Sequence, residues 1–144
     1  MADNGQSDVA NGQCHCGGVK FRVSLLDGLD KPVRCNCSMC RMKGATMVFA
    51  RLGSIAVTEG EHLLSAYQFH SNTAKHFFCS RCGIHTYHQR RFDPSLYAVN
   101  VACLAGVSPY DFAQVPVLDG ENHPRDRGGT ELGIAGTVRF EAEG

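Results

Sequence analysis

Several features that would place a protein in a well-known class are missing from this sequence of 144 residues. No stretch approaches the roughly 18 apolar residues of a membrane-spanning helix. Residues 1–12 are polar and have neither the positive nor the apolar region of a secretory signal. The 14 basic residues balance the 14 acidic ones, so the basic excess typical of nucleic-acid binders is absent. These absences predict a cytoplasmic protein with no membrane or nucleic-acid partner.

Familiar catalytic signatures are missing too, since the chain has no G-x-S-x-G, no P-loop and no paired-carboxylate motif. What it does have is cysteine, eight in all. All but Cys103 fall in three short clusters, Cys14-His15-Cys16, Cys35-Asn36-Cys37-Ser38-Met39-Cys40 and Cys79-Ser80-Arg81-Cys82. Cytosolic thiols stay reduced, and neighbours in C-x-C are poorly placed to form a disulfide. Clusters of this kind therefore favour tetrahedral zinc sites.

Short apolar segments separated by glycine predict a mostly β fold with antiparallel sheets held together by zinc. An apolar content of 43% is enough for a core. Gly53 is expected to break the strand that precedes it, and a helical turn over residues 39–43 is expected to end at Gly44. We predict a flexible head over residues 1–11 and a single domain over residues 12–144. Strands are expected at residues 19–23, 46–50, 55–58, 63–69, 84–89, 96–103 and 137–140.

The clustered cysteines divide most economically into a set of four and a set of three. Cys14 and Cys16 with Cys79 and Cys82 would make a closed, structural four-sulfur shell. On an extended strand the two side chains of C-x-C point the same way. The C-x-x-C pair, followed by Gly83, would supply the other half as a tight knuckle. Such a site would join an early strand to a late loop and contribute folding free energy.

Cys35, Cys37 and Cys40 are then left as three ligands with an open fourth position, which is the pattern of a catalytic zinc. Spacing leaves two alternatives open. In the first, a fourth side chain closes the shell and makes the site structural; in the second, the triplet shares a metal with the last cysteine pair. The candidates for the fourth ligand are His76, His85, His88 and Cys103.

Basic residues surround the triplet. Arg34, Arg41 and Lys43 would keep thiolates ionised and would hold the carboxylates of a bound ligand; the alternative is an ordinary solvated surface. Cys103 lies in an apolar run and is expected to fill the core. His62, His70 and His123 have no metal-ligand spacing and are expected on the surface or in loops.

With these residues in view, the chain resembles the glutathione-dependent formaldehyde-activating enzyme family, which includes centromere protein V. The resembling segments are residues 12–23, 34–45, 67–87 and 97–104. The resemblance implies an Mss4-like fold, a structural zinc on the set of four cysteines and a catalytic zinc on the triplet. It also implies carbon–sulfur lyase chemistry that joins glutathione, or a similar small thiol, to formaldehyde or another small aldehyde.

Two departures keep the activity open. The chain is shorter than the formaldehyde-activating members and is nearer the small branch with centromere protein V. Residues 117–123 are similar to that branch's F-D-G-x-N-W motif, with Leu118 and His123 in place of the aromatic residues. The alternatives are a non-catalytic carrier of glutathione adducts and a zinc-stabilised protein-interaction module.

Overall fold

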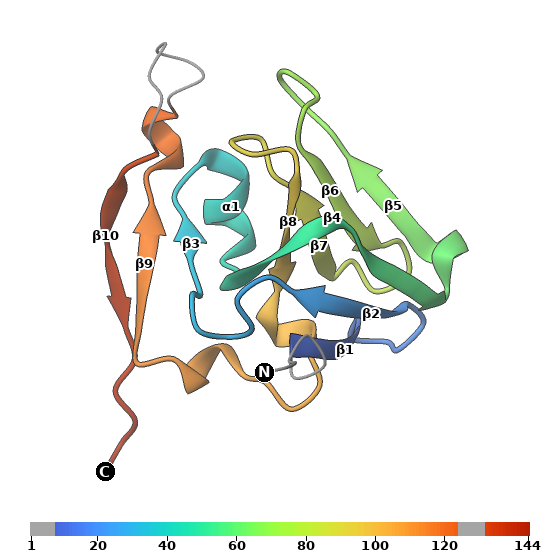
Figure 1. The fold of residues 1–144 in the computed structure, drawn as a ribbon, viewed down its shortest axis with the longest axis horizontal. Helices are drawn as coiled ribbons and strands as arrows, with labels where there is room; N and C mark the ends of the chain where they lie inside the picture. The colour runs from blue at the N-terminus through green and yellow to red at the C-terminus, as the bar shows by residue number, and fades with distance from the viewer. Residues whose placement is uncertain (1–7, 124–131) are drawn as a thin grey trace.

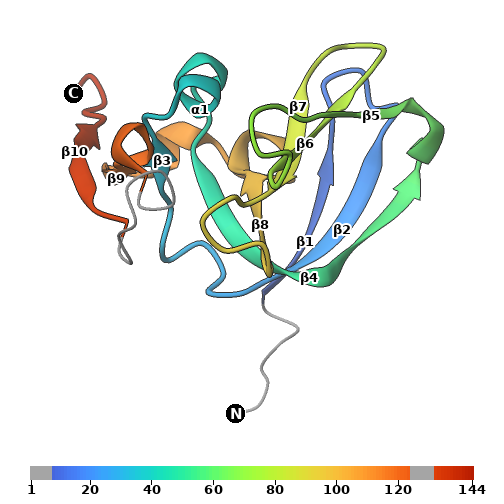
Figure 2. The same ribbon diagram turned by 90° about the horizontal axis from the view of Figure 1, so that it is seen from above.

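The computed structural model describes residues 8–123 and 132–144, which form two β-sheets. A seven-stranded antiparallel sheet has the strand order β1-β2-β4-β8-β7-β6-β5, and a three-stranded sheet has the order β10-β9-β3. In both views α1 lies between the smaller sheet and the strands of the larger one (Figures 1 and 2). The predicted mostly β fold is confirmed. The elements are β1 (Val9–Gln13), β2 (Lys20–Leu25), β3 (Arg34–Cys35), α1 (Ser38–Lys43), β4 (Met47–Glu59), η2 (Glu61–Leu63), β5 (Leu64–Tyr67), β6 (Lys75–Cys79), β7 (His85–Gln89), β8 (Leu96–Asn100), η3 (Val101–Cys103), η4 (Pro109–Asp111), β9 (Gln114–Leu118), η5 (Gly120–Asn122) and β10 (Ile134–Arg139).

The main core lies on one face of the larger sheet. Alternation in β2 buries Phe21, Val23 and Leu25 while the residues between them face solvent, as expected for a half-buried strand. Burying each of these side chains contributes about 1.5–3 kcal/mol. The Phe21 ring meets Tyr87 of β7 edge to face, with ring centroids 5.5 Å apart. This packing joins β2 to β7 across the sheet.

Gly53 does not break its strand, contrary to the prediction. β4 runs without interruption through both expected segments. The register with β2 shifts between Val23, which pairs with Ile55, and Leu25, which pairs with Ala50. Gly53 has a φ of 88° within this irregular stretch, a conformation that glycine adopts without strain. The glycine therefore bends one long strand instead of separating two.

Two predicted boundaries need correction. The flexible head was expected to reach residue 11, whereas β1 already begins at Val9. There Val9 pairs with Ser24 of β2. Residues 1–7 lie outside the described part of the chain. The strand expected over residues 96–103 ends at Asn100. There the side-chain oxygen of Asn100 accepts a hydrogen bond from the Ala102 backbone N–H and starts η3.

The smaller sheet brings the C-terminal part of the chain to the cysteine triplet. β9, which the sequence did not indicate, pairs in parallel with β3, aligning Arg34 with Val117 and Cys35 with Leu118. The helix that follows β3 is the expected one. Cys37 is its N-cap, and it ends at Gly44, whose φ is 65°. A two-residue strand and a short helix thus set the three sulfurs beside the loop after β9.

Candidate metal centres

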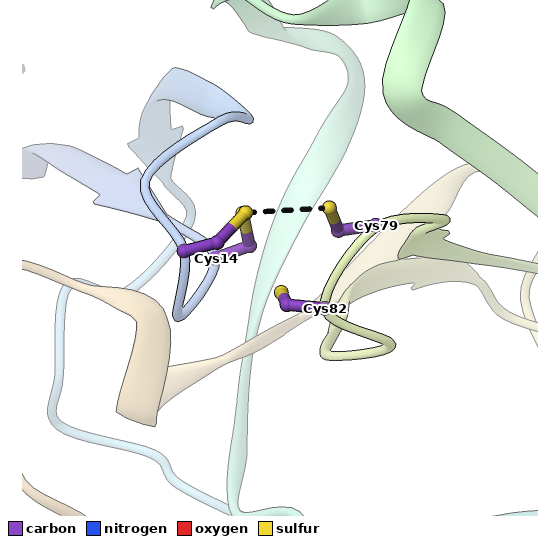
Figure 3. A group of neighbouring side chains, drawn as sticks. Cys14, Cys79 and Cys82 are labelled. Carbon is purple, nitrogen blue, oxygen red and sulfur yellow. Dashed lines mark hydrogen bonds between the residues drawn. The ribbon is translucent and has the colours of Figure 1, made fainter.

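The first cluster gathers four cysteine sulfurs from two distant loops. The Sγ atoms of Cys14, Cys16, Cys79 and Cys82 all lie within 4.8 Å of one another. The Cys14–Cys16 separation is 3.6 Å and the Cys16–Cys79 separation is 3.8 Å. A tetrahedral zinc with bonds of about 2.3 Å needs sulfurs about 3.8 Å apart. Figure 3 shows Cys14 facing Cys79 and Cys82 across this gap. The four residues fit a zinc ion.

Local backbone geometry supplies N–H donors to these sulfurs. Cys14 and Cys16 lie in the β1–β2 hairpin loop and not on an extended strand as expected; the turn at Gly17, with a φ of 76°, brings both sulfurs to one side. The Val19 N–H donates to the Cys14 sulfur at 3.3 Å, and the Gly18 N–H donates to that of Cys16 at 3.4 Å. Such donors favour the thiolate form that a metal binds.

Arg81 adds a charged donor to the same cluster. Its Nε donates to the Cys16 sulfur at 3.4 Å, and its backbone N–H donates to the Cys79 sulfur at the same distance. The hydrogen bond from Arg81, together with that from the Gly18 N–H, lowers the pKa of Cys16 to about 6. A residue inside the C-x-x-C pair therefore neutralises part of the charge of the shell.

The second cluster contains Cys35, Cys37 and Cys40, whose Sγ atoms also lie within 4.8 Å of one another. Cys35 ends β3, and Cys37 caps α1. Cys40 belongs to α1, and its side chain is buried, with 7% of the residue exposed. The Cys37 sulfur accepts a hydrogen bond from the Cys40 backbone N–H at 3.3 Å. Hydrogen bonds from the Cys35 and Cys40 side chains lower the pKa of Cys37 to about 2. Soft sulfur donors of this kind suit zinc.

Among the described residues, no histidine or further cysteine joins this triplet. His76, His85 and His88 form a separate cluster, and the Cys103 thiol lies in the main core and donates to the His85 carbonyl at 3.5 Å. The last cysteine pair belongs to the first cluster. Within the described residues, the fold therefore does not assemble either alternative, a triplet closed by a histidine or Cys103, or a triplet that shares a metal with the last cysteine pair.

The three histidines instead surround the ammonium group of Lys43. Its Nζ lies 3.1 Å from His76 Nδ1, 3.1 Å from His85 Nε2 and 3.2 Å from His88 Nδ1. An ammonium group can only donate, so all three ring nitrogens accept. Burial and the Lys43 charge lower the pKa of His76 to about 4 and that of His85 to about 2. The three imidazoles are thus neutral at pH 7 and satisfy one buried cation.

Replacing Lys43 by Met is expected to lower the free energy of unfolding by about 1–3 kcal/mol, the penalty for leaving buried acceptors without a donor. The pKa of His76 should rise, because the charge that lowers it is gone. Urea unfolding of zinc-saturated protein measures the first effect, and histidine NMR titration measures the second. Lys75→Met, on the exposed side of β6, is the control; an equal effect of both substitutions would contradict the role of Lys43.

A cavity of about 510 Å³ adjoins the triplet. Aromatic rings of Phe49, Phe69 and Phe92 form part of its wall, together with His76 and His88. The segment after β9 also lines it: His123, expected on the surface, is only 6% exposed and meets the Phe92 ring at 6.0 Å between centroids. The cysteine triplet therefore opens on a largely apolar space that can hold a small ligand.

Asn36, between two of the cysteines, ties the C-terminal segment to the triplet. Its side-chain oxygen accepts from the Glu121 N–H at 2.8 Å, and its amide group donates to Asp119 at 3.3 Å. Its backbone N–H donates to the Leu118 carbonyl at 3.2 Å. These bonds hold Gly120 close to the Cys35 sulfur and to Cys37. No pattern around Asn36 in the sequence indicated this role.

Gly120→Ala is expected to disturb the triplet, since the added methyl group would lie 2.5 Å from Cys35 Sγ and 2.9 Å from Cys37 Cβ. Overpacking of this kind destabilises by about 1–3 kcal/mol, and we expect zinc affinity at the triplet to fall by about tenfold, the equivalent of 1.4 kcal/mol. Competition with a chelating dye measures that affinity. The control is Gly133→Ala, whose methyl group would meet no atom within 4 Å; unchanged affinity in Gly120→Ala would contradict the close contact.

The predicted ligand-binding residues lie in different surroundings. Arg41 lines the cavity. Arg34 instead donates through Nη2 to the Gly44 carbonyl at 2.7 Å, and Lys43 is committed to the histidines. Arg90, which the sequence did not single out, also lines the cavity; its place directly after a strand gave no signal. Of the three predicted residues, the geometry favours a ligand contact for Arg41.

This fold and these clusters define a mostly β protein with two sets of cysteines that can hold zinc. The family model described as glutathione-dependent formaldehyde-activating enzyme matches residues 9–114. The chain therefore belongs to the glutathione-dependent formaldehyde-activating enzyme family, as its resemblance indicated. The matched residues include both cysteine clusters, whereas the cavity residues from Leu118 to His123 lie beyond them.

A solved structure is also similar to this chain in sequence and fold. The crystal structure of a Rhodobacter sphaeroides protein is 50% identical to this chain, with a TM-score of 0.73. The similarity covers 74% of this chain and 98% of that one. In the described part of the present chain, no helix has the length and apolar character needed to span a membrane.

Proposed function

We propose that the protein condenses glutathione with formaldehyde to give S-hydroxymethylglutathione at the Cys35–Cys37–Cys40 triplet. The observation that carries this proposal is the triplet of converging sulfurs on the wall of a ligand-sized cavity, with no fourth cysteine or histidine from the described residues. In the reaction the sulfur of the thiol forms a bond to the carbonyl carbon. The S–H proton passes to the carbonyl oxygen, which becomes the hydroxyl group, so no oxidant or reductant is needed.

The two cysteine sets have different roles in this proposal. Cys14, Cys16, Cys79 and Cys82 would hold a structural zinc, and the triplet would hold a second one. Zinc at the triplet supplies a lowered pKa to a thiol that binds it. The chain itself contributes the cavity: the rings of Phe49, Phe69 and Phe92 keep water away from the reacting atoms and leave an apolar surface for the small aldehyde. Holding both reactants there replaces a bimolecular encounter with an oriented one.

Exchange NMR between formaldehyde and its glutathione adduct tests the proposal, because it measures the forward and reverse rates at equilibrium. Zinc-loaded protein should raise both rates above the uncatalysed addition and saturate with glutathione. Rates equal to those without protein would contradict an enzyme. Tight calorimetric binding of glutathione combined with such unchanged rates would identify a carrier of the adduct instead.

A further inference from the structure

The side chain of Arg90 is held between aromatic rings beside the triplet. Arg90 follows β7, and its backbone N–H donates to the Leu96 carbonyl at 3.0 Å where the chain turns toward β8. The guanidinium carbon lies 4.2 Å from the centre of the Phe49 ring and 5.6 Å from that of Phe92. Stacking of this kind fixes the plane of the guanidinium and leaves its N–H groups free to donate at its edge.

Those N–H groups find no acceptor among the described residues. No carboxylate or carbonyl of residues 8–123 and 132–144 accepts a hydrogen bond from the Arg90 side chain. Within the same residues the ion pair that forms joins Lys31 to Asp27 and does not involve Arg90. The negative charges of Asp93, Cys35 and Cys40 favour the cationic form of Arg90. A half-buried cation with five donors normally has an anionic or polar partner. The missing partner indicates an anion that the protein binds from outside.

The cavity that Arg90 lines also contains the triplet. Arg41 and Arg91 belong to the same wall, and Glu121 is the one acidic residue among the described residues that line it. The wall is therefore cationic where the ligand would lie. A planar guanidinium offers two parallel donors that match the two oxygens of a carboxylate. A ligand with a sulfur at the triplet and a carboxylate at Arg90 would fit both features of the cavity.

We propose that Arg90 is the carboxylate-binding residue of this cavity and that it restricts the substrate to thiols that carry a carboxylate. The inference rests on the proposed function for the role of the thiol, but the contact of Arg90 with the carboxylate does not need a metal. Glu121 is the group on the same wall that can receive an ammonium group of the ligand. An amino-acid-like thiol thus meets charges of the correct sign, whereas a simple amine thiol has no partner for Arg90.

Calorimetric binding of two probes to zinc-loaded protein tests the inference. S-methylglutathione has the carboxylates of glutathione but no free thiol, and cysteamine has a thiol but no carboxylate. Arg90→Gln should weaken binding of S-methylglutathione about 10- to 100-fold, as expected for loss of a charge-assisted hydrogen bond. It should leave cysteamine binding unchanged, which also shows that the variant is folded. Arg90→Lys keeps the positive charge but not the two parallel N–H donors of the guanidinium, and it should retain part of the affinity.

Arg51→Gln is the matched control, because Arg51 is exposed on β4 and does not line the cavity; it should bind both probes like the original protein. The inference is overturned if the original protein does not bind S-methylglutathione, or if Arg90→Gln binds it equally well. Failure of cysteamine to bind the original protein would instead count against the thiol role of the triplet. The S-methylglutathione result would still decide the role of Arg90.

Discussion

Cys79→Ser is expected to lose one zinc ion. The variant should be unfolded at room temperature and should therefore show no cooperative unfolding transition on heating. Cys79 is fully buried, and its sulfur links the β6–β7 knuckle to the β1–β2 hairpin. Structural zinc contributes about 10–16 kcal/mol in zinc-finger peptides, which equals or exceeds the whole stability of a typical domain, about 5–15 kcal/mol. The remaining core is small around this site: Cys14, Val19 and Cys79 form their own buried cluster, with little apolar area to replace the metal.

Zinc content by mass spectrometry under native conditions, followed by thermal unfolding monitored by circular dichroism, checks this expectation. Cys103→Ser is the matched control, since Cys103 lies outside both clusters and its replacement also donates a hydrogen bond. That variant should retain both zinc ions and a cooperative transition. A Cys79→Ser protein with a full zinc complement and an unchanged melting temperature would show that the first cluster is not the support of the fold.

Cys37→Ala is expected to have the opposite pattern, losing activity while the fold survives. The Cys37 sulfur accepts a hydrogen bond from the Cys40 backbone N–H and lies within 4.8 Å of the other two sulfurs of the triplet, so its removal leaves that set with two sulfur ligands. Loss of a direct ligand should lower zinc affinity at the triplet by more than about 100-fold, since loss of an outer hydrogen-bond partner already lowers affinity 10- to 100-fold. The formaldehyde–glutathione exchange rate should then equal the uncatalysed rate.

The same variant should keep the zinc of the four-cysteine cluster and unfold cooperatively, because α1 loses a capping side chain worth only about 1 kcal/mol. Cys103→Ala serves as the matched cysteine-to-alanine control and should show full activity. Catalysis by Cys37→Ala at the original rate would place the reaction elsewhere in the molecule.

The groups of cysteines could be foreseen from spacing because C-x-C and C-x-x-C restrict where neighbouring sulfurs can point. A helical turn over residues 39–43 was foreseen because Gly44 marks its end, and the observed helix begins one residue earlier, at Ser38. β4 was predicted as two strands because a glycine inside a strand is ambiguous: Gly53 in the left-handed conformation permits a bulge as readily as a break. Local pattern alone does not separate the two outcomes.

The surroundings of the triplet could not be foreseen, because they depend on contacts between distant segments. Asn36 meets the loop after β9 through hydrogen bonds that span more than 80 residues of sequence. Lys43 was expected at a ligand but is enclosed by three histidines from β6 and β7. Arg90 is brought to the cavity by the turn between β7 and β8. Only the packing of the two sheets makes these residues neighbours.

X-ray absorption at the zinc edge, before and after addition of glutathione, tests most directly whether a saturated set of sulfurs coexists with an unsaturated one. Protein loaded with two zinc ions should show an all-sulfur shell together with a sulfur shell that includes one light atom, and glutathione should replace that atom by sulfur. A purely sulfur spectrum that glutathione leaves unchanged, or the binding of a single zinc, would mean that no place for the thiol exists at Cys35, Cys37 and Cys40.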